Sequence, residues 1–329
     1  MTTREVLQTR LHLQGLDTPR FRTPAEMVRY FGAVQAQDFF GSLWAVGQRV
    51  MNATEQSVEA ALNDGTIVRS WPMRGTIHYT APGDLRWMLD LLGERAIAKS
   101  ALNQRNVGLT RKDFTKSRSI LEKELQGRRL VERNELYDIL ERRKIDTKNT
   151  RGLHIIGQMA REKVICFGPR KGKQPTFVLL DEWIPATREL SREEALAELS
   201  SRYFKSHGPA TVHDFAWWSG LTIADATRGM EMARGIDFDR HEPRRKPVVN
   251  LLPCYDEFFI AYKERENVKI IFSPTIALNG QTIGTWKRTI TKKGVSIKTK
   301  LFGKLSKQVS VALQKQLDRY ADFIGYIRL

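Results

Sequence analysis

Residues 54–81, TEQSVEAALNDGTIVRSWPMRGTIHYTA, decide the fold that the sequence predicts. The first twelve of them indicate a helix, because they begin at a threonine and end at Gly65, and glycine often follows the last turn of a helix. Two β-like runs follow, TIVRSWPM and GTIHYTA, with Arg74-Gly75 between them. Short apolar runs separated by a glycine-containing turn are typical of a hairpin. The stretch therefore predicts a helix followed by a hairpin.

Two further helices are predicted upstream of this stretch. One covers EVLQTRLHLQ, residues 5–14, and the other covers TPAEMVRYFGAVQ, residues 23–35. The second begins with Thr23 as a candidate N-cap and Pro24 at the first helical position. Three helices and then a hairpin are the order of a winged helix-turn-helix. We therefore predict a first winged-helix module over residues 1–105.

The same order recurs twice downstream. Helices are predicted at residues 113–127, 133–144 and 152–163, and the run VICFGPRKGKQPTFVLLD then reads as strand, basic turn and strand. A third copy opens at Ser191, with Glu194 three residues later as in a capping box. Two more helices follow, with Gly220 at the break and with Phe215 and Trp218 at helical spacing, as expected of core residues. The second module is assigned to residues 106–188 and the third to residues 189–245.

The pattern changes after about residue 246. Short apolar or alternating runs lie between Gly, Pro and Asn residues, and Asn279-Gly280 between two of them is a strong hairpin signal. A terminal helix is predicted over SKQVSVALQKQLDRYADFIG, residues 306–325. Residues 246–329 thus predict a small β-barrel-like domain or curled sheet with a terminal helix. The fold class is α+β: tandem winged-helix modules followed by this C-terminal domain.

The charge of the chain indicates a polyanionic partner. Lys and Arg total 54 against 37 acids, for a net charge of +17 and a pI near 10.0. A basic surface without a partner is the alternative, but such an excess usually meets nucleic acid. Between Asn267 and Leu317 there is no Asp or Glu, and the ten basic residues there are Lys269, Lys287, Arg288, Lys292, Lys293, Lys298, Lys300, Lys304, Lys307 and Lys315. We expect this stretch to follow a phosphate backbone.

A second basic cluster falls on the helices and wing of the middle module. Its members are Arg142, Arg143, Lys144, Lys148, Arg151, Arg170, Lys171 and Lys173. Winged helices touch nucleic-acid backbones at such positions. Duplex DNA is favoured over RNA, because no aromatic motif of the kind that stacks single-stranded bases is present in the sequence.

Other sequence features exclude several classes of protein. No stretch of 18 apolar residues is present and the N-terminus lacks the apolar core of a signal peptide, so we expect a cytoplasmic protein without a membrane segment. Cys166 and Cys254 lie far apart, as in a reducing compartment. The six His residues lack metal-ligand spacing, and no nucleotide-binding glycine loop or hydrolase motif occurs. We expect no cofactor, no metal, no obligate protein partner and a monomer.

Two stretches remain unusual after this survey. GAVQAQDFFG places Gln35 and Gln37 at the exit of a predicted helix, and on composition alone both would be ordinary polar residues there. RSWPMRGTIHY places Trp71 and Arg74 on the first predicted wing. His78 stands out among the histidines because it follows Arg74 and Thr76 on one face of a predicted strand; for the others, a surface or hydrogen-bonded core position is favoured.

At these stretches the sequence resembles the AlkZ/YcaQ family of winged-helix DNA glycosylases. The motifs that carry the resemblance are GAVQAQD, VRSWPMRGTIHYTAPGDL, RYFKSHGPATVHDFAWWSGLTIADA, LLPCYDEFFIAYKER and GTWKRT, in the family's order, from about residue 5 to the C-terminus. The resemblance implies tandem winged-helix units and a C-terminal β-barrel around a concave DNA-binding surface. It also implies hydrolysis of N3- or N7-alkylated purines and, in some members, of interstrand crosslinks through guanine N7, with the bacterial nucleoid as the place of action.

The resemblance further implies that Gln35-Ala36-Gln37 is the catalytic motif. A Gln-apolar-Gln triplet is similar to the AlkZ-like branch, although Asp38 next to it leaves open whether a carboxylate participates. A Gln amide cannot act as a base at neutral pH, but it can hold a water by hydrogen bonds. A cationic alkylpurine leaves without an added proton, so placing the water is the remaining task. Two residues separated by one share a face only in extended backbone, so the helix must end by Gln35; Gly41 and Ser42 are expected as turn residues nearby.

The matching blocks supply candidate DNA contacts and supporting residues. Backbone contacts are predicted for Arg74, Lys263, Arg265, Lys287, Arg288, Lys292 and Lys293, with a structural salt bridge as the alternative for the first three. Asp38, Trp71, Thr76 and His78 are candidates for supporting the site. A single base could be flipped out, whereas a crosslinked base requires an open cleft. The rival hypothesis is a winged-helix transcriptional regulator that binds intact DNA; a nuclease is disfavoured because no paired carboxylates at metal-binding spacing stand out.

Overall fold

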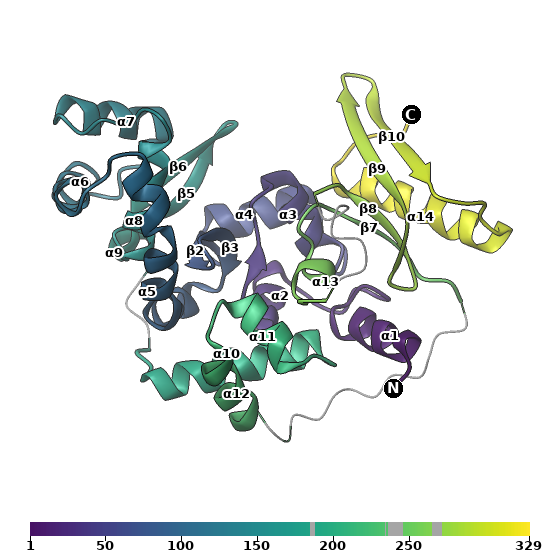
Figure 1. Cartoon of the computed structure of the whole chain (residues 1–329). Helices are drawn as coiled ribbons and strands as arrows, with labels where there is room; N and C mark the ends of the chain where they lie inside the picture. Colours follow the sequence, from purple (N-terminus) through teal and green to yellow (C-terminus); the bar gives the residue numbers. More distant parts are fainter. Residues whose placement is uncertain (185–187, 234, 236–245, 265–271) are drawn as a thin grey trace. The chain divides into compact units, whose positions relative to one another are not determined.

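The computed structural model describes residues 1–184, 188–233, 235, 246–264 and 272–329, and it combines helices with antiparallel sheets (Figure 1). Its residues group into two compact units. The first unit contains Met1–Ala60, Leu199–Trp218 and Thr222–Leu329, and the second contains Ala61–Glu198 and Ser219–Leu221. The predicted division into four modules stays a prediction.

Two helices begin where capping signals in the sequence predict them. Thr23 caps α2 (Pro24–Phe31), since its hydroxyl accepts the backbone N–H of Glu26 at 3.1 Å. Ser191 and Glu194 form the predicted capping box at the start of α10, because each side chain bonds the other residue's backbone N–H. Both N-terminal signals are thus confirmed. The helices that lie wholly or mostly in the first unit are α1 (Thr3–Leu13), α2, α3 (Phe39–Gly47), α4 (Glu55–Asn63), α10 (Arg192–His207), α11 (Val212–Ser219), α12 (Ile223–Met232), α13 (Glu257–Ile260) and α14 (Lys307–Phe323).

The C-terminal sheet of the first unit has the strand order β10-β9-β8-β7. Its strands are β7 (Val249–Leu252), β8 (Thr275–Leu278), β9 (Gln281–Thr291) and β10 (Gly294–Leu301), all antiparallel. The predicted hairpin at Asn279-Gly280 is confirmed, because both residues have positive φ, 49° and 85°, as its tight turn requires.

This sheet does not close into a barrel. Its order leaves β7 and β10 at the edges, so among the strands that the structure describes the expected closure is not found. The reason is geometric: a sheet closes into a barrel only when it has enough strands for its two edges to meet, and this sheet has four. Helix α14 packs against β7 instead and covers the apolar side of the open sheet (Figure 1).

Gly47, near the end of α3, marks the closest approach between α3 and α14. A Cβ at Gly47 would lie 2.1 Å from Cε2 of Phe323, and Trp44 packs its ring on Tyr320 and Phe323 at centroid distances of 5.1 and 5.0 Å. We expect Gly47→Ala to lower the free energy of unfolding by about 1–3 kcal/mol, because the added methyl forces the ring aside. Urea unfolding would measure it.

Gly303 provides the matched control for this substitution. It lies in the same unit, and a Cβ there would meet no atom within 4 Å. Gly303→Ala should therefore leave the urea midpoint nearly unchanged. Equal midpoints for Gly47→Ala and Gly303→Ala would contradict the close packing of α3 on α14.

The second unit contains the middle series of helices and two hairpins. The hairpin of β2 (Val68–Met73) and β3 (Thr76–Thr80) confirms the predicted one, with Ser70 opposite His78. A second hairpin pairs β5 (Ile165–Lys171) with β6 (Gln174–Leu179), and β4 (Val131–Glu132) completes the order β4-β6-β5. The helices are α5 (Pro82–Asn106), α6 (Arg111–Glu124), α7 (Arg133–Arg142), α8 (Arg151–Arg161) and α9 (Leu180–Trp183).

The core of the second unit joins its two hairpins. The buried residues of this cluster come from β2, α5, β5, β6 and α9, and they are Val68, Leu85, Leu89, Cys166, Val178, Leu180 and Ile184. Burial of the Cys166 thiol raises its pKa far above the usual range, so this cysteine is inert at neutral pH. No helix within the described ranges is long and apolar enough to cross a membrane.

Candidate active site

The Gln-Ala-Gln triplet lies in extended backbone between two helices. Helix α2 ends at Phe31, because Gly32 has φ of 80°, and the chain then forms β1 (Val34–Gln35) before α3 begins. Ala36 is fully buried, whereas Gln35 is half-buried and Gln37 is exposed. Gln35 ends β1 and the chain bends at Gln37. Because alternate residues of extended backbone point to opposite sides, the exposure pattern leads us to expect both amides on the side opposite the buried Ala36. The helix has thus ended by Gln35, as the water-holding arrangement requires.

The predicted reason for that helix end was wrong. Gly41 and Ser42 lie inside α3 and form no turn, since the backbone N–H of Ser42 donates to the carbonyl of Asp38 at 2.9 Å. Gly32 ends the preceding helix instead. Gly41 has a different role, because a Cβ there would lie 2.5 Å from Oδ2 of Asp38. The absence of a side chain at Gly41 leaves room for the Asp38 carboxylate beside the triplet.

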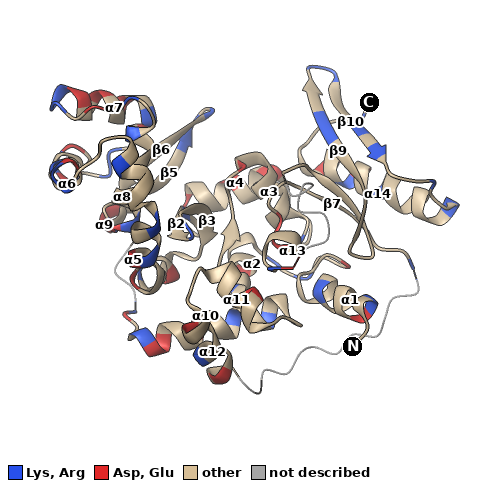
Figure 2. Ribbon diagram, viewed as in Figure 1, with Lys and Arg blue, Asp and Glu red and all other residues tan. Residues whose placement is uncertain are grey.

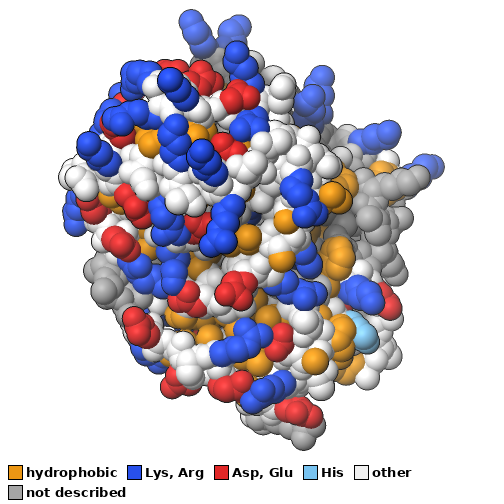
Figure 3. All heavy atoms as spheres, turned by 60° about the vertical axis from the view of Figure 1, so that its left-hand side comes forward, with side chains coloured by type: hydrophobic (Ala, Val, Ile, Leu, Met, Phe, Trp, Pro, Cys, Tyr) orange, Lys and Arg blue, Asp and Glu red, His pale blue; other side chains and the backbone are white. Residues whose placement is uncertain are grey.

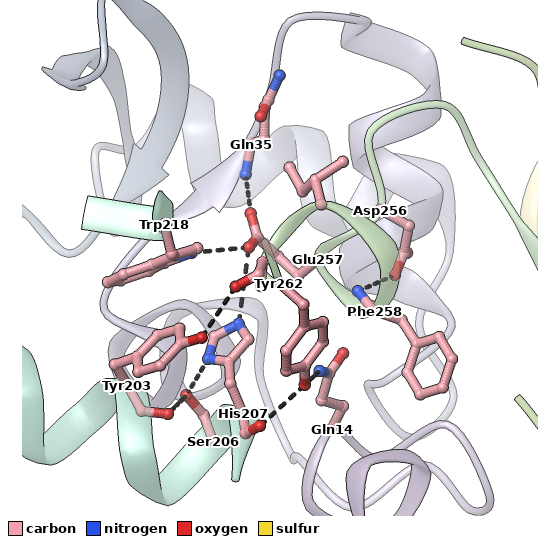
Figure 4. A network of polar contacts seen from close by, with 12 residues as sticks. Gln14, Gln35, Tyr203, Ser206, His207, Trp218, Asp256, Glu257, Phe258 and Tyr262 are labelled. Carbon is pink, nitrogen blue, oxygen red and sulfur yellow. Dashed lines mark hydrogen bonds and ion pairs between the residues drawn. The ribbon is translucent and has the colours of Figure 1, made fainter. Parts of the chain in front are cut away.

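A buried carboxylate from α13 holds the backbone of the triplet. The backbone N–H of Gln35 donates to Oε1 of Glu257 at 2.7 Å, and the indole N–H of Trp218 donates to Oε2 at 2.9 Å. Glu257 is 1% exposed. Figure 4 shows the Gln35 side chain directed away from Glu257, and the hydrogen bond to the carboxylate comes from the Gln35 backbone.

His207 packs beside Glu257 inside an aromatic cluster. Its ring stacks on Tyr203 at 4.9 Å, and its Nε2 is 3.6 Å from Oε2 of Glu257 (Figure 4). Burial lowers the pKa of the His207 imidazole, although the neighbouring Glu257 opposes this effect, so the ring is neutral at pH 7. The core positions expected for Phe215 and Trp218 are confirmed, since both are fully buried.

Asp256, directly before Glu257, fixes the start of α13. Arg49 donates to both of its carboxylate oxygens, at 2.6 and 2.9 Å, and both side chains are fully buried. Asp256 also accepts the backbone N–H of Phe258 at 3.0 Å and the side-chain amide of Gln48 at 3.2 Å. The short helix that carries Glu257 is therefore anchored by a buried ion pair.

Phe40 and Arg288 lie near the start of α3. The guanidinium of Arg288 lies over the Phe40 ring at 5.3 Å, donates to the Tyr320 hydroxyl and is 3.9 Å from a carboxylate oxygen of Glu55. Burial raises the pKa of Tyr320, so its hydroxyl stays protonated. Arg288, three residues before the end of β9, is thus engaged by protein groups.

The hairpin itself presents lysines to solvent. Lys287 of β9 pairs with Lys298 of β10, and both side chains are exposed, as are those of Lys292 and Lys293 at the turn. Figure 2 shows the blue of Lys and Arg along β9 and β10. Like charges directly opposite each other in a sheet are unfavourable. An anion bound across the pair would relieve that repulsion, so this face of the hairpin is suited to phosphate.

Two further predicted DNA contacts are Lys263 and Arg265. Lys263 is exposed, and its backbone N–H donates to Asp214 at 2.8 Å, which leaves the ammonium group outside the core. Arg265 lies outside the described residues, as does Lys269. In the part of the chain that the structure describes, no three His, Cys, Asp or Glu side chains gather in a way that could hold a metal ion.

The second unit brings together Arg74, Thr76 and His78. Arg74, with φ of 55° at the β2–β3 turn, donates to Nε2 of His78 at 3.2 Å, and Nδ1 of that ring is 2.9 Å from the carbonyl of Thr76. Thr76 and His78 both lie on β3, whereas Arg74 lies in the turn before it and reaches the His78 ring from there. Trp71 stacks on Phe167 at 4.7 Å, a contact within the same unit.

Three residues of the basic cluster of the second unit pair with acids. Arg143 is 2.8 Å from a carboxylate oxygen of Glu124, Arg151 is 3.4 Å from Asp146, and Lys171 is 3.4 Å from Glu132. On the face that Figure 3 brings forward, Lys and Arg side chains are interspersed with Asp and Glu. The acid-free β9–β10 hairpin differs from this cluster in having no carboxylate in its own strands or turn.

Sequence reasoning did not assign Glu257 or His207 to the site, and it gave Trp218 only a core position. Each lies inside a block that carries the family resemblance, and that was the available signal. Nothing in the local pattern marked Glu257, because a glutamate beside Asp256 in an apolar run resembles any helix start. Its position below Gln35 arises from a contact between residues 222 positions apart.

Comparison with known proteins identifies similar sequences and a similar structure. The sequence profile described as "DNA glycosylase AlkZ-like" matches residues 28–323. An "Interstrand DNA cross-link repair glycosylase" from Streptomyces sahachiroi is 25% identical over 225 residues, which are 66% of this chain and 60% of that relative, so the match spans less than two thirds of the relative's length. The solved structure of "Streptomyces sahachiroi DNA glycosylase AlkZ" matches with a TM-score of 0.79 at 20% identity, over 100% of this chain and 98% of that chain. At this identity the likeness establishes the fold.

Proposed function

Because the chain belongs to the DNA glycosylase AlkZ-like family, we propose that it hydrolyses the N-glycosidic bond of cationic N3- or N7-alkylated purines in duplex DNA. The observation that supports this proposal is the Gln35-Ala36-Gln37 segment after the end of α2, in which Ala36 is buried between the half-buried Gln35 and the exposed Gln37. In the proposed reaction, the amides hold one water against the sugar carbon as the bond to the purine breaks.

The amide chemistry limits the substrate. Neither Gln can remove a proton from water at neutral pH, so the leaving base must depart readily on its own. A purine alkylated at N3 or N7 carries a positive charge and leaves as a neutral base without an added proton. Ordinary purines lack that advantage, so we infer selectivity for cationic bases from the residues that hold the water.

Interstrand crosslinks through guanine N7 are included in the proposal. The Streptomyces sahachiroi relative is named for crosslink repair, and the chemistry at guanine N7 is the same for a monoadduct and a crosslink. A crosslinked base cannot swing out of the duplex, so it must be attacked in place. The exposure of Gln37 and Asp38 fits a site that a bulky lesion can approach.

DNA would be held through the lysines of the β9–β10 hairpin and through the second unit. The order α6, β4, α7, α8, β5, β6 is that of a winged helix, so we infer one winged-helix module there. Arg74 and Lys263 remain proposed backbone contacts. Arg288 we assign to holding the hairpin against α3, since Tyr320, Phe40 and Glu55 already contact its guanidinium.

Substitution of hairpin lysines should change the salt dependence of DNA binding. Each lysine that neutralises one phosphate contributes about 0.9 to the slope of log affinity against log salt. We expect Lys287→Gln/Lys298→Gln to lower the slope by nearly 2. Fluorescence anisotropy on an undamaged duplex between about 50 and 200 mM salt would measure it.

Lys205→Gln is the control for this measurement. Lys205 is exposed in the same unit, on α10, and its ammonium lies 5.9 Å from the Tyr30 ring. Its substitution should leave the slope unchanged. The hairpin interface is refuted if the double variant and Lys205→Gln show the slope of the unmodified protein.

Release of free base tests the reaction itself. The protein would be incubated with duplex DNA containing N7-methylguanine, and separately with a guanine N7 crosslink, and the free base and abasic sites would be quantified. The proposal predicts release from both substrates and none from unmodified DNA. Tight binding to one intact sequence without release from either substrate would replace the glycosylase by a transcriptional regulator.

A further inference from the structure

Glu257 is a buried carboxylate that connects the Gln-Ala-Gln segment to the interior of the first unit. Both of its oxygens accept N–H groups, Oε1 from the Gln35 backbone at 2.7 Å and Oε2 from the Trp218 indole at 2.9 Å (Figure 4). Accepting at both oxygens is the pattern of an ionised carboxylate. Burying such a group is unfavourable unless N–H groups replace its water, and here the Gln35 and Trp218 N–H groups do so.

We propose that Glu257 is a positioning residue of the reaction: its carboxylate fixes the Gln35 peptide plane and thereby aims the Gln35 and Gln37 amides at the attacking water. This inference rests on the proposed function. Charge-assisted hydrogen bonds are shorter and stronger than neutral ones, and a neutral acceptor would hold the peptide less firmly. Because Ala36 is fully buried between the two Gln residues, a rotation at Gln35 is transmitted to Gln37.

The surroundings hold Glu257 itself in place. Trp218 and His207 are fully buried and lie against it, with ring centroids 5.4 Å apart. Tyr203 contacts both rings, with its centroid 4.9 Å from each. Asp256 anchors the same short helix to Arg49. The carboxylate therefore has one orientation, as a group that sets the geometry of another residue needs.

The mutational test compares Glu257→Ala, Glu257→Gln and Trp218→Phe with the unsubstituted protein. We expect Glu257→Ala to lower the single-turnover rate of N7-methylguanine release on the order of a hundredfold, the cost of a misplacement of about 1 Å. Glu257→Gln keeps one acceptor oxygen, so its rate should fall less. Trp218→Phe retains the ring but removes one donor to Glu257, and its decrease should be the smallest. The dissociation constant for undamaged duplex should stay unchanged in all three.

Combination with Gln35→Ala separates positioning from other roles. Removing the Gln35 amide leaves nothing at that position for Glu257 to aim, so Glu257→Gln should lower the rate less in the Gln35→Ala background than in the unsubstituted protein. If Glu257→Gln lowered the rate by the same factor in both backgrounds, the proposal would be overturned. Glu257 would then act directly in the reaction or only support the structure.

Asp84→Asn controls for loss of stability alone. Asp84 is a buried acid of the second unit that accepts the indole N–H of Trp87 at 3.2 Å, so it matches the Glu257–Trp218 contact. This variant should unfold at lower temperature and yet release base at the unsubstituted rate. A Glu257→Gln protein that is only less stable, with an unchanged rate well below its unfolding temperature, would also refute positioning.

Amide hydrogen exchange at Gln35 provides a readout that does not need activity. Glu257→Ala removes the acceptor of this N–H, so its exchange should accelerate while amides elsewhere in β1 and α3 change little. If the unsubstituted protein releases no base, both the proposed function and catalytic positioning fail. The exchange rate of the Gln35 amide still reports whether Glu257 holds Gln35 in that case. Unchanged exchange in Glu257→Ala refutes the inference in an active enzyme.

Discussion

Gln35→Ala and Gln37→Ala should each lower the single-turnover rate of N7-methylguanine release by about a hundredfold to a thousandfold, the effect of removing one positioned hydrogen-bond group from a reacting site. Gln35 and Gln37 flank the buried Ala36. In the proposed reaction, removing either amide would leave the water held from one side only. The free base would be quantified by chromatography, with enzyme in excess over DNA.

Gln56→Ala is the control for these two variants. Gln56 is exposed on α4 of the same unit, so its loss should leave both rate and stability unchanged. The affinity of Gln35→Ala and Gln37→Ala for undamaged duplex should also match that of the unsubstituted protein. Full activity in both variants would exclude the amides from the reaction, even if base release itself is confirmed.

Asp256→Asn should lower the free energy of unfolding by about 3–5 kcal/mol, because it leaves the Arg49 guanidinium buried without its counter-charge. The pair is fully buried, with Arg49 donating to both carboxylate oxygens. Chemical unfolding followed by tryptophan fluorescence would measure the change. Base release should also slow, because Asp256 anchors the helix that carries Glu257.

The control for this prediction is an ion pair at the surface. Asp318 lies 3.2 Å from Arg328, and 58% of its side chain is exposed. Exposed pairs contribute about 1 kcal/mol or less, so Asp318→Asn should have little effect. The buried pair would be refuted by a loss in Asp256→Asn no larger than that in Asp318→Asn.

Local signals in the sequence predicted most helix and strand positions. Caps at Thr23 and Ser191 and the turn at Asn279-Gly280 depend on neighbouring residues alone, and each was confirmed. The predicted barrel failed, because closure of a sheet depends on how many strands pair and in what order, which no local pattern contains. The 25-residue helix α5 was not predicted either.

The candidate site was predictable only in part for the same reason. The Gln-Ala-Gln triplet was recognised through a resemblance, and the condition that it be extended followed from side-chain geometry. That the preceding helix α2 ends at Gly32, without the turn expected at Gly41, could be learned only from the structure. Glu257 could not be connected with Gln35 from the sequence, because a contact over such a separation is invisible to periodicity and spacing.

The hydrogen bond between Gln35 and Glu257 also bears on when the protein can first act during its synthesis. Its two ends are 222 residues apart, and ribosomes add roughly 5–20 residues per second. The triplet is therefore synthesised roughly ten to forty seconds before the carboxylate that holds it. A nascent or prematurely terminated chain can carry both glutamines and still lack the assembled site, so activity should appear only near the completion of translation.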